Sequence, residues 1–168
     1  LFDLGLGNGR IRPGAESGFQ AASGASRQPL PQGNHGAGAG ATIGKYLGAG
    51  RAMKGGLGCA SLRAQDGLIV GAVVAVNAVG DVTDPDSGRI LAGARDPAGA
   101  FPGYLFHALK GSAGVPSPRQ NTTIGVIAAN VDWSQAEATK VAQMAHDGLA
   151  RAIRPSHLPM DGDTLFTL

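Results

Sequence analysis

Glycine is the residue that most constrains what this chain can fold into, because it supplies 28 of the 168 residues. An average protein contains about 7% glycine. Collagen requires glycine at a strict period of three, and a coiled coil requires far more than the 15% of charged residues present here. Aliphatic runs at 68–70 and 73–76 bury enough apolar surface to exclude a disordered chain. We therefore expect a folded domain in which glycine provides tight turns and close backbone contacts.

The charge and the cysteine content exclude several classes of protein. Fourteen Lys and Arg against twelve Asp and Glu give a net charge of +2, and because the basic residues are scattered we expect no nucleic-acid partner. Cys59 is the single cysteine, which excludes an internal disulfide and a cysteine-based zinc site. The four histidines lack the spacing of metal ligands, and we interpret them as ordinary surface or core residues: His35, His107, His146 and His157. No metal and no other cofactor is expected.

No segment of the sequence has the pattern of a membrane span or a signal peptide. The most apolar region, 66–81, is interrupted by Gly67, Gly71 and Asn77 and stays below the roughly 20 residues that a span needs. We expect no membrane partner and a cytoplasmic location. We also expect the chain to be a piece of a longer protein and to form a single partial domain over residues 1–168.

Periodicity and turn residues predict a mixture of helices and strands. The segments 12–25 and 104–109 are predicted as short helices, while 80–100 and 111–120, rich in Asp, Pro and Gly, are predicted as loops. Segments with β-branched and alternating residues predict four strands, at 56–64, 67–79, 121–131 and the end of 161–168. The strand at 67–79 is expected to be buried on both faces.

The longest predicted helix follows the strand at 121–131. Ser134 and Glu137 form the S-x-x-E pattern of a capping box, and apolar residues then recur at helical spacing up to a stop at Pro155. Arg151 and Arg154 suit the C-terminal end of this helix. Because strands and helices are mixed without regular βαβ alternation, the predicted fold class is α+β.

The glycine-rich segment 33–44 is followed directly by Lys45 and therefore invites comparison with phosphate-binding loops. A P-loop requires Gly five residues before its Gly-Lys pair and Ser or Thr after the Lys, but Ala39 and Tyr46 occupy these positions. The dinucleotide pattern fails as well, since Ile43 stands where its third Gly belongs. We therefore interpret the segment as a glycine-lined turn that packs against backbone or substrate.

Asn121 and Thr122 open a strand directly after a proline-containing loop. An ordinary strand entrance explains this pattern, since Thr is favoured in strands and Asn in turns. The functional alternative is a self-cleavage site before Thr122. Cleavage would give Thr122 a free α-amine with a pKa of about 7.7–8.0, a general base beside its own hydroxyl. Such a threonine is an activated nucleophile that needs no histidine.

Asp161 and Asp163 lie two residues apart at the entrance to the last predicted strand. The segment lacks the later ligands of a calcium loop, and an Asp-Gly turn explains it in structural terms. The functional alternative is a pair of carboxylates that orients the proton network of a nucleophile.

Six motifs, in the same order along the chain, resemble the P1 peptidase family, peptidase family S58, which contains the DmpA-type aminopeptidases and the nylon-oligomer hydrolases. The motifs lie at 40–45 (GATIGK), 53–58 (MKGGLG), 76–81 (VNAVGD), 121–130 (NTTIGVIAAN), 143–155 (QMAHDGLARAIRP) and 161–166 (DGDTLF). Together they cover nearly the whole chain.

The resemblance implies an N-terminal-nucleophile-type fold, a four-layer αββα sandwich that is incomplete at both ends here. It implies self-cleavage between Asn121 and Thr122 into α-subunit residues 1–121 and β-subunit residues 122–168, with Thr122 as the nucleophile. Asp161 and Asp163 would position the nucleophile. Lys45 would sit beside it, and Asn77 would hold it or the oxyanion.

The implied activity is hydrolysis of linear amides, either as an aminopeptidase or as a 6-aminohexanoate-oligomer hydrolase. The implied partners are a small peptide or amide substrate, the chain's own processed subunit and further αβ heterodimers in a homo-oligomer. Phe2, a candidate substrate-binding residue, stands where related enzymes commonly have a tyrosine, and it lacks the hydroxyl that would donate a hydrogen bond to the oxyanion. Two alternatives stay open: an acyltransferase of ornithine acetyltransferase type, and a non-catalytic glycine-rich module.

Overall fold

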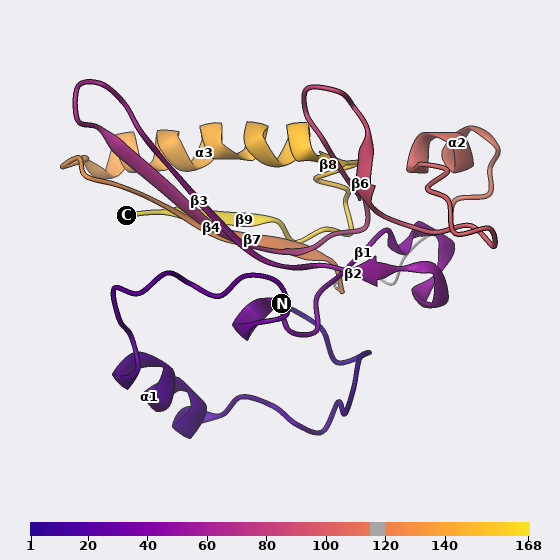
Figure 1. Ribbon diagram of the computed structural model, residues 1–168, viewed down its shortest axis with the longest axis horizontal. Helices are drawn as coiled ribbons and strands as arrows, with labels where there is room; N and C mark the ends of the chain where they lie inside the picture. Colours follow the sequence, from indigo (N-terminus) through magenta and orange to yellow (C-terminus); the bar gives the residue numbers. More distant parts are fainter. Residues whose placement is uncertain (115–119) are drawn as a thin grey trace.

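The computed structural model describes residues 1–114 and 120–168, and a four-stranded sheet lies at its centre (Figure 1). The strands follow one another in the order β3-β4-β7-β9. They are β3 (Gly56–Arg63), β4 (Ile69–Asn77), β7 (Thr122–Ala129) and β9 (Thr164–Thr167). β4 is antiparallel to both of its neighbours, β3 and β7, and β9 is parallel to β7. The four strands predicted from the sequence are therefore confirmed, with ends shifted by a few residues.

Helix α3 (Gln135–Ala152) covers one face of this sheet, as Figure 1 shows. The predicted capping box is present: the Ser134 hydroxyl accepts the Glu137 N–H, and the Glu137 carboxylate accepts the Ser134 N–H. Leu149 of the helix packs with Ile127 of β7, and the apolar side chains around them form the main core. The helix begins where the sequence predicts and ends at Ala152.

The opposite face of the sheet is only partly covered. Alternation along β4 and β7 places every second residue on this face, and Val73 pairs there with Val126, which in turn pairs with Phe166 of β9. Val73 and Val126 are half-buried and Phe166 is exposed. Ala75 and Asn77 of β4 are fully buried on this same face, and no residue of β4 is exposed. The predicted burial of the second strand on both faces is therefore confirmed at its C-terminal end, whereas the rest of the strand is half-buried.

A second, three-stranded sheet has the order β6-β5-β8 and lies beside the end of α3. It consists of β5 (Asp81–Thr83), β6 (Ile90–Ala92) and β8 (Ile153–Arg154). Two predictions are corrected here. The segment 80–100 is not all loop, since β5 and β6 pair across it, and Arg154 lies in β8 rather than in the helix.

The remaining elements are short. β1 (Thr42–Ile43) pairs with β2 (Met53–Lys54), and three 3-10 helices lie nearby: η1 (Gly36–Gly38), η2 (Lys45–Leu47) and η3 (Ala49–Arg51). The two predicted short helices are confirmed as α1 (Ala15–Ser23) and α2 (Tyr104–Leu109). The predicted loop 111–120 falls mostly on residues 115–119, outside the described residues.

The fold class is confirmed as mixed α+β with several sheets. The described residues do not form a full four-layer sandwich, because no second sheet packs face to face on the open side of the four-stranded sheet. None of the helices in the region that the structure describes is long and apolar enough to cross a membrane.

Candidate active site

Thr122 and Asn77 lie side by side at one end of the four-stranded sheet. They are partners in the antiparallel register of β4 and β7, so their side chains project from the same face. That face is the one opposite α3, because the neighbouring positions Val76 and Thr123 face the helix side. The strand register alone thus brings together two residues that are far apart in the sequence.

The amide of Asn77 is fully buried and uses both of its polar atoms. Its Nδ2 donates to the main-chain oxygens of Phe2 and Gln120, each at 3.0 Å. Its Oδ1 accepts the main-chain N–H of Thr42 at 2.9 Å and the ammonium of Lys45 at 2.8 Å. These contacts lock the amide in one orientation, with its N–H bonds directed at Phe2 and at the chain just before Thr122.

Lys45 places its ammonium among three oxygen acceptors. Its Nζ lies 2.8 Å from both the main-chain oxygen and Oδ1 of Asn77, and 3.3 Å from the main-chain oxygen of Gln120. Burial lowers the pKa of Lys45 to about 8, and the opposite charge of Asp161 partly counteracts this. Lys45 is therefore more easily deprotonated than an exposed lysine, and its ammonium donates these hydrogen bonds.

Gly44 makes this position of Lys45 possible. It adopts a left-handed conformation with φ of 66°, and a Cβ at this residue would lie 2.0 Å from the main-chain nitrogen of Ala94. Gly44 and Lys45 then donate their N–H groups to the oxygens of Gly80 and Val79. The glycine-rich segment thus packs tightly against backbone, as one of the sequence interpretations holds.

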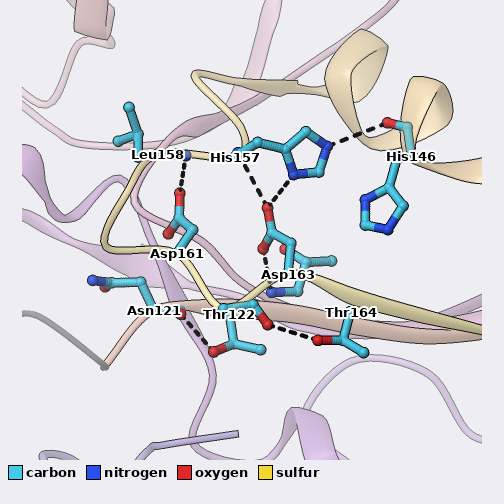
Figure 2. A network of polar contacts seen from close by, with 10 residues as sticks. Asn121, Thr122, His146, His157, Leu158, Asp161, Asp163 and Thr164 are labelled. Atoms are coloured by element: carbon cyan, nitrogen blue, oxygen red, sulfur yellow. Dashed lines mark hydrogen bonds and ion pairs between the residues drawn. The ribbon is translucent and has the colours of Figure 1, made fainter. Parts of the chain in front are cut away.

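The carbonyl of Asn121, the residue before Thr122, accepts two hydrogen bonds. One comes from the main-chain N–H of Gly162 at 2.9 Å, and the other comes from the Thr122 hydroxyl itself, as Figure 2 shows. Asn121 also forms a parallel bridge with Asp161 and is fully buried. The Thr122 hydroxyl is therefore held against the peptide bond that precedes it.

Asp161 lies in the loop that leads to β9, and its side chain is half-buried. Its Oδ2 accepts the main-chain N–H of Leu158 at 3.2 Å. Burial raises the pKa of this carboxyl, and the nearby charge of Asp163 raises it further. Backbone N–H groups and the Lys45 ammonium oppose this rise.

Asp163 contacts the residue that follows Thr122. Its Oδ1 accepts the main-chain N–H of Thr123 at 2.7 Å. Its Oδ2 lies 2.9 Å from Nδ1 of His157 and also accepts the His157 main-chain N–H at 3.2 Å. The sequence interpretation of His157 as an ordinary histidine therefore misses a residue that contacts the site.

Phe2 contacts the site through its main chain. Its carbonyl accepts an N–H of the Asn77 amide, and the residue, 39% exposed, lines a cavity of about 320 Å³. Asp3, Lys45, Gln120 and Asn121 line the same cavity. The cavity is therefore continuous with the polar groups beside Thr122.

The structure brings all seven predicted site residues into one region, although not every predicted contact forms. The Thr122 hydroxyl donates to Asn121, while Asp163 reaches the strand through Thr123 and Asp161 contacts Leu158. Within residues 1–114 and 120–168, no cluster of three or more His, Cys, Asp or Glu residues is arranged to hold a metal ion.

Comparison with known proteins identifies relatives of the whole chain. The family model of peptidase family S58 matches residues 4–168. An uncharacterized aminopeptidase of Mycobacterium tuberculosis is 41% identical over 176 residues, which span 100% of this chain and 48% of the relative. A 6-aminohexanoate-oligomer endohydrolase of Kocuria sp. is 33% identical over 171 residues, again covering 100% of this chain and 48% of the relative. The chain spans about half the length of the curated relatives it matches.

Proposed function

Since the chain belongs to peptidase family S58, we propose that it forms a portion of a self-processing hydrolase of linear amides, with Thr122 as the nucleophile. The observation that carries this proposal is the contact of the Thr122 hydroxyl with the Asn121 carbonyl. The same carbonyl accepts the Gly162 N–H, a donor that would stabilise negative charge on this oxygen.

Self-cleavage would proceed by attack of Thr122 Oγ1 on the carbonyl carbon of Asn121. The hydroxyl loses its proton as the C–O bond forms, and the Gly162 N–H stabilises the resulting oxyanion. The C–N bond then breaks, and the departing amine takes a proton, leaving an ester between Asn121 and Thr122. Water hydrolyses this ester to the Asn121 carboxylate and restores the hydroxyl. The products are two pieces, residues 1–121 and residues 122–168.

Cleavage would also prepare the site for an external substrate. In the uncut chain, the ammonium of Lys45 and the amide of Asn77 both donate to the carbonyl of Gln120. The segment that ends at Asn121 therefore occupies the place of a substrate carbonyl in the cavity. When this segment moves away, the same donors become free to stabilise the oxyanion of a bound amide.

In the hydrolytic reaction, the new α-amine of Thr122 takes the proton of its hydroxyl, and Oγ1 attacks the substrate amide. The amine product leaves with a proton, and water then releases the acid from the acyl-enzyme. Relatives named as an aminopeptidase and as a 6-aminohexanoate-oligomer endohydrolase support linear amides as the substrate class. Phe2 lines the cavity that would receive the substrate.

The open face of the four-stranded sheet supports the finer fold proposal. Phe166, Val126 and Val73 form an apolar row on this face, and apolar sheet faces are stable when another layer covers them. We place the second sheet of a four-layer αββα sandwich here, within an αβ heterodimer that assembles further into a homo-oligomer.

The test of the proposal is a pair of substitutions at neighbouring threonines. Thr122→Ala is expected to abolish both self-cleavage and amide hydrolysis, as shown by intact mass and by product analysis. Thr123→Val is the matched control, because the Thr123 hydroxyl is buried and finds no hydrogen-bond partner among the described residues. The control should still yield a piece that begins at Thr122. Full hydrolytic activity in an uncut protein would refute the proposal.

A further inference from the structure

His157 lies at the end of a series of contacts that leads to the strand of the proposed nucleophile. Its imidazole and its main-chain N–H both contact Oδ2 of Asp163, at 2.9 Å and 3.2 Å. The other carboxylate oxygen accepts the N–H of Thr123 at 2.7 Å. The Asp163 side chain is only 5% exposed, so a single buried carboxylate connects the imidazole to the backbone directly after Thr122 (Figure 2).

The backbone of His157 adopts an unfavourable conformation at this point. Its φ is 55°, in the left-handed region, and no other non-glycine residue in the described region of the chain has a positive φ. This conformation is disfavoured for residues with a Cβ, and it persists only where surrounding contacts stabilise it. Here it directs two donors of one residue at the same carboxylate oxygen.

Both ring nitrogens of His157 face acceptors. Nδ1 faces Asp163, and Nε2 lies 3.5 Å from the main-chain oxygen of His146, at the outer limit of a hydrogen bond. The two histidine rings pack with their centroids 4.9 Å apart. An imidazole with an acceptor at each nitrogen is fully satisfied when both nitrogens carry protons. In that form its positive charge would lie beside the Asp163 carboxylate.

The charged groups around this pair come from three elements. Asp163 and Asp161 lie in the segment that enters β9, and Asp163 raises the pKa of Asp161. Lys45 of η2 faces Asp161 with the opposite charge. His146 of α3 is the titratable residue that packs against the imidazole from the helix side. Without a charge on His157, the two carboxylates would be compensated by Lys45 alone among these groups.

We propose that His157 is a positioning residue that holds the Asp163 carboxylate against the Thr123 N–H and offsets its charge beside the reactive threonine. This inference rests on the proposed function of Thr122. After cleavage, an uncompensated Asp163 would hold the Thr122 α-amine in its protonated form to higher pH, because an opposite charge favours the ammonium. His157 therefore keeps the amine available as a base near neutral pH.

Two substitutions in the intact protein separate the two roles of His157. His157→Asn keeps a side-chain donor and tolerates the left-handed conformation, but it carries no charge. We expect it to cleave itself, while the acidic limb of its hydrolysis rate moves to higher pH by about half a unit. His157→Gly allows the left-handed backbone conformation but removes the whole side chain, and it is expected to slow self-cleavage roughly tenfold. Added imidazole should partly restore this rate, because the ring is 37% exposed and its site is open to solvent.

The controls distinguish a failure of this inference from a failure of the proposed function. His35→Asn makes the same chemical change at an exposed histidine and is expected to leave the cleavage rate and the pH profile unchanged. Absence of a cut before Thr122 in the parent protein would overturn the proposed function, and this inference with it. A cut parent whose two His157 variants cleave at the parental rate with an unmoved acidic limb would overturn this inference alone.

Discussion

At the scale of single residues, burial shifts the pKa of two groups close to Thr122. Lys45 has a pKa lowered to about 8 by burial, and Asp161 has a pKa raised by burial and by Asp163. The attraction between the two opposes both shifts, since Asp161 raises the pKa of Lys45 and Lys45 lowers that of Asp161. The desolvation of each group nevertheless outweighs this attraction.

Asp161→Asn is expected to raise the thermal stability of the protein at pH 7. Because the folded state holds the proton of Asp161 more tightly than the unfolded chain, this carboxyl contributes less stability as the pH rises through its folded pKa. Removing the charge should raise Tm by roughly 2–4 °C at pH 7. The advantage should disappear below about pH 4, where both states are protonated.

The measurement is the Tm of the parent and of the Asp161→Asn variant between about pH 3.5 and pH 8, in steps of roughly half a pH unit. Asp66→Asn, in an exposed turn, shows what removal of a surface carboxylate does by itself. A variant that is less stable than the parent at pH 7 would mean that the attraction to Lys45 outweighs burial.

At the scale of elements, the turn before η2 determines where Lys45 lies. Gly44 and Lys45 donate to backbone oxygens of the segment 79–80, and the next residue, Tyr46, is buried and donates its hydroxyl to Asp81 at 2.9 Å. Asp81 also accepts the Ala94 N–H at 2.9 Å. The turn therefore joins η2 to the three-stranded sheet through buried hydrogen bonds.

Gly44→Ala is expected to destabilise the protein more than Gly111→Ala does. Both glycines are left-handed, with φ of 66° and 65°, so each substitution carries a similar backbone cost of about 1–2 kcal/mol. A Cβ at Gly44 would lie 2.0 Å from the Ala94 nitrogen, whereas a Cβ at Gly111 meets open space. We expect a further loss of about 1–3 kcal/mol at Gly44.

Urea unfolding measures the difference in the free energy of unfolding between the two variants. The cost of the left-handed backbone is common to both and cancels in this difference. Self-cleavage of the folded Gly44→Ala protein should also slow, because the substitution displaces Lys45. Equal losses of stability in the two variants would show that the backbone at Gly44 moves away from Ala94 without cost.

At the scale of the whole molecule, the proposed cleavage site lies within the central sheet. β7 pairs with β4 along its whole length and with β9 along half of it, so residues 122–168 supply two of the four strands and α3. Residues 1–121 supply β3 and β4. Self-cleavage would break one peptide bond at the start of β7 without interrupting any of these pairings.

The two pieces are therefore expected to stay together after cleavage. Size-exclusion chromatography in native buffer should give one species of the same size for the cut protein and for the uncut Thr122→Ala variant. Denaturing electrophoresis should then separate the cut protein into two bands. Elution of two separate pieces under native conditions would contradict this expectation.

Much of the fold follows from local sequence patterns. The β-branched run at 121–131 and the capping box at Ser134 predict β7 and the start of α3, because strand alternation and helix capping depend on residues only a few positions apart. Local patterns also single out Thr122, Asp161 and Asp163 as candidates, and the family motifs point to the same three residues.

The tertiary structure decided the contacts between distant segments. β5 and β6 form in a segment rich in turn residues, where the buried Asp81 bonds to Ala94 of the same segment and to Tyr46 and Tyr104 outside it. The pairing of His157 with Asp163 depends on one left-handed residue, and no spacing in the sequence indicates it.

The role of glycine also follows partly from the sequence and partly from the tertiary structure. The sequence alone excludes fibrous and disordered chains, whereas the tertiary structure shows where a close approach requires glycine, as at Gly44 against Ala94. Local patterns encode strands and helices, because these depend on neighbouring residues. Hydrogen bonds across tens of residues form only once the chain has packed.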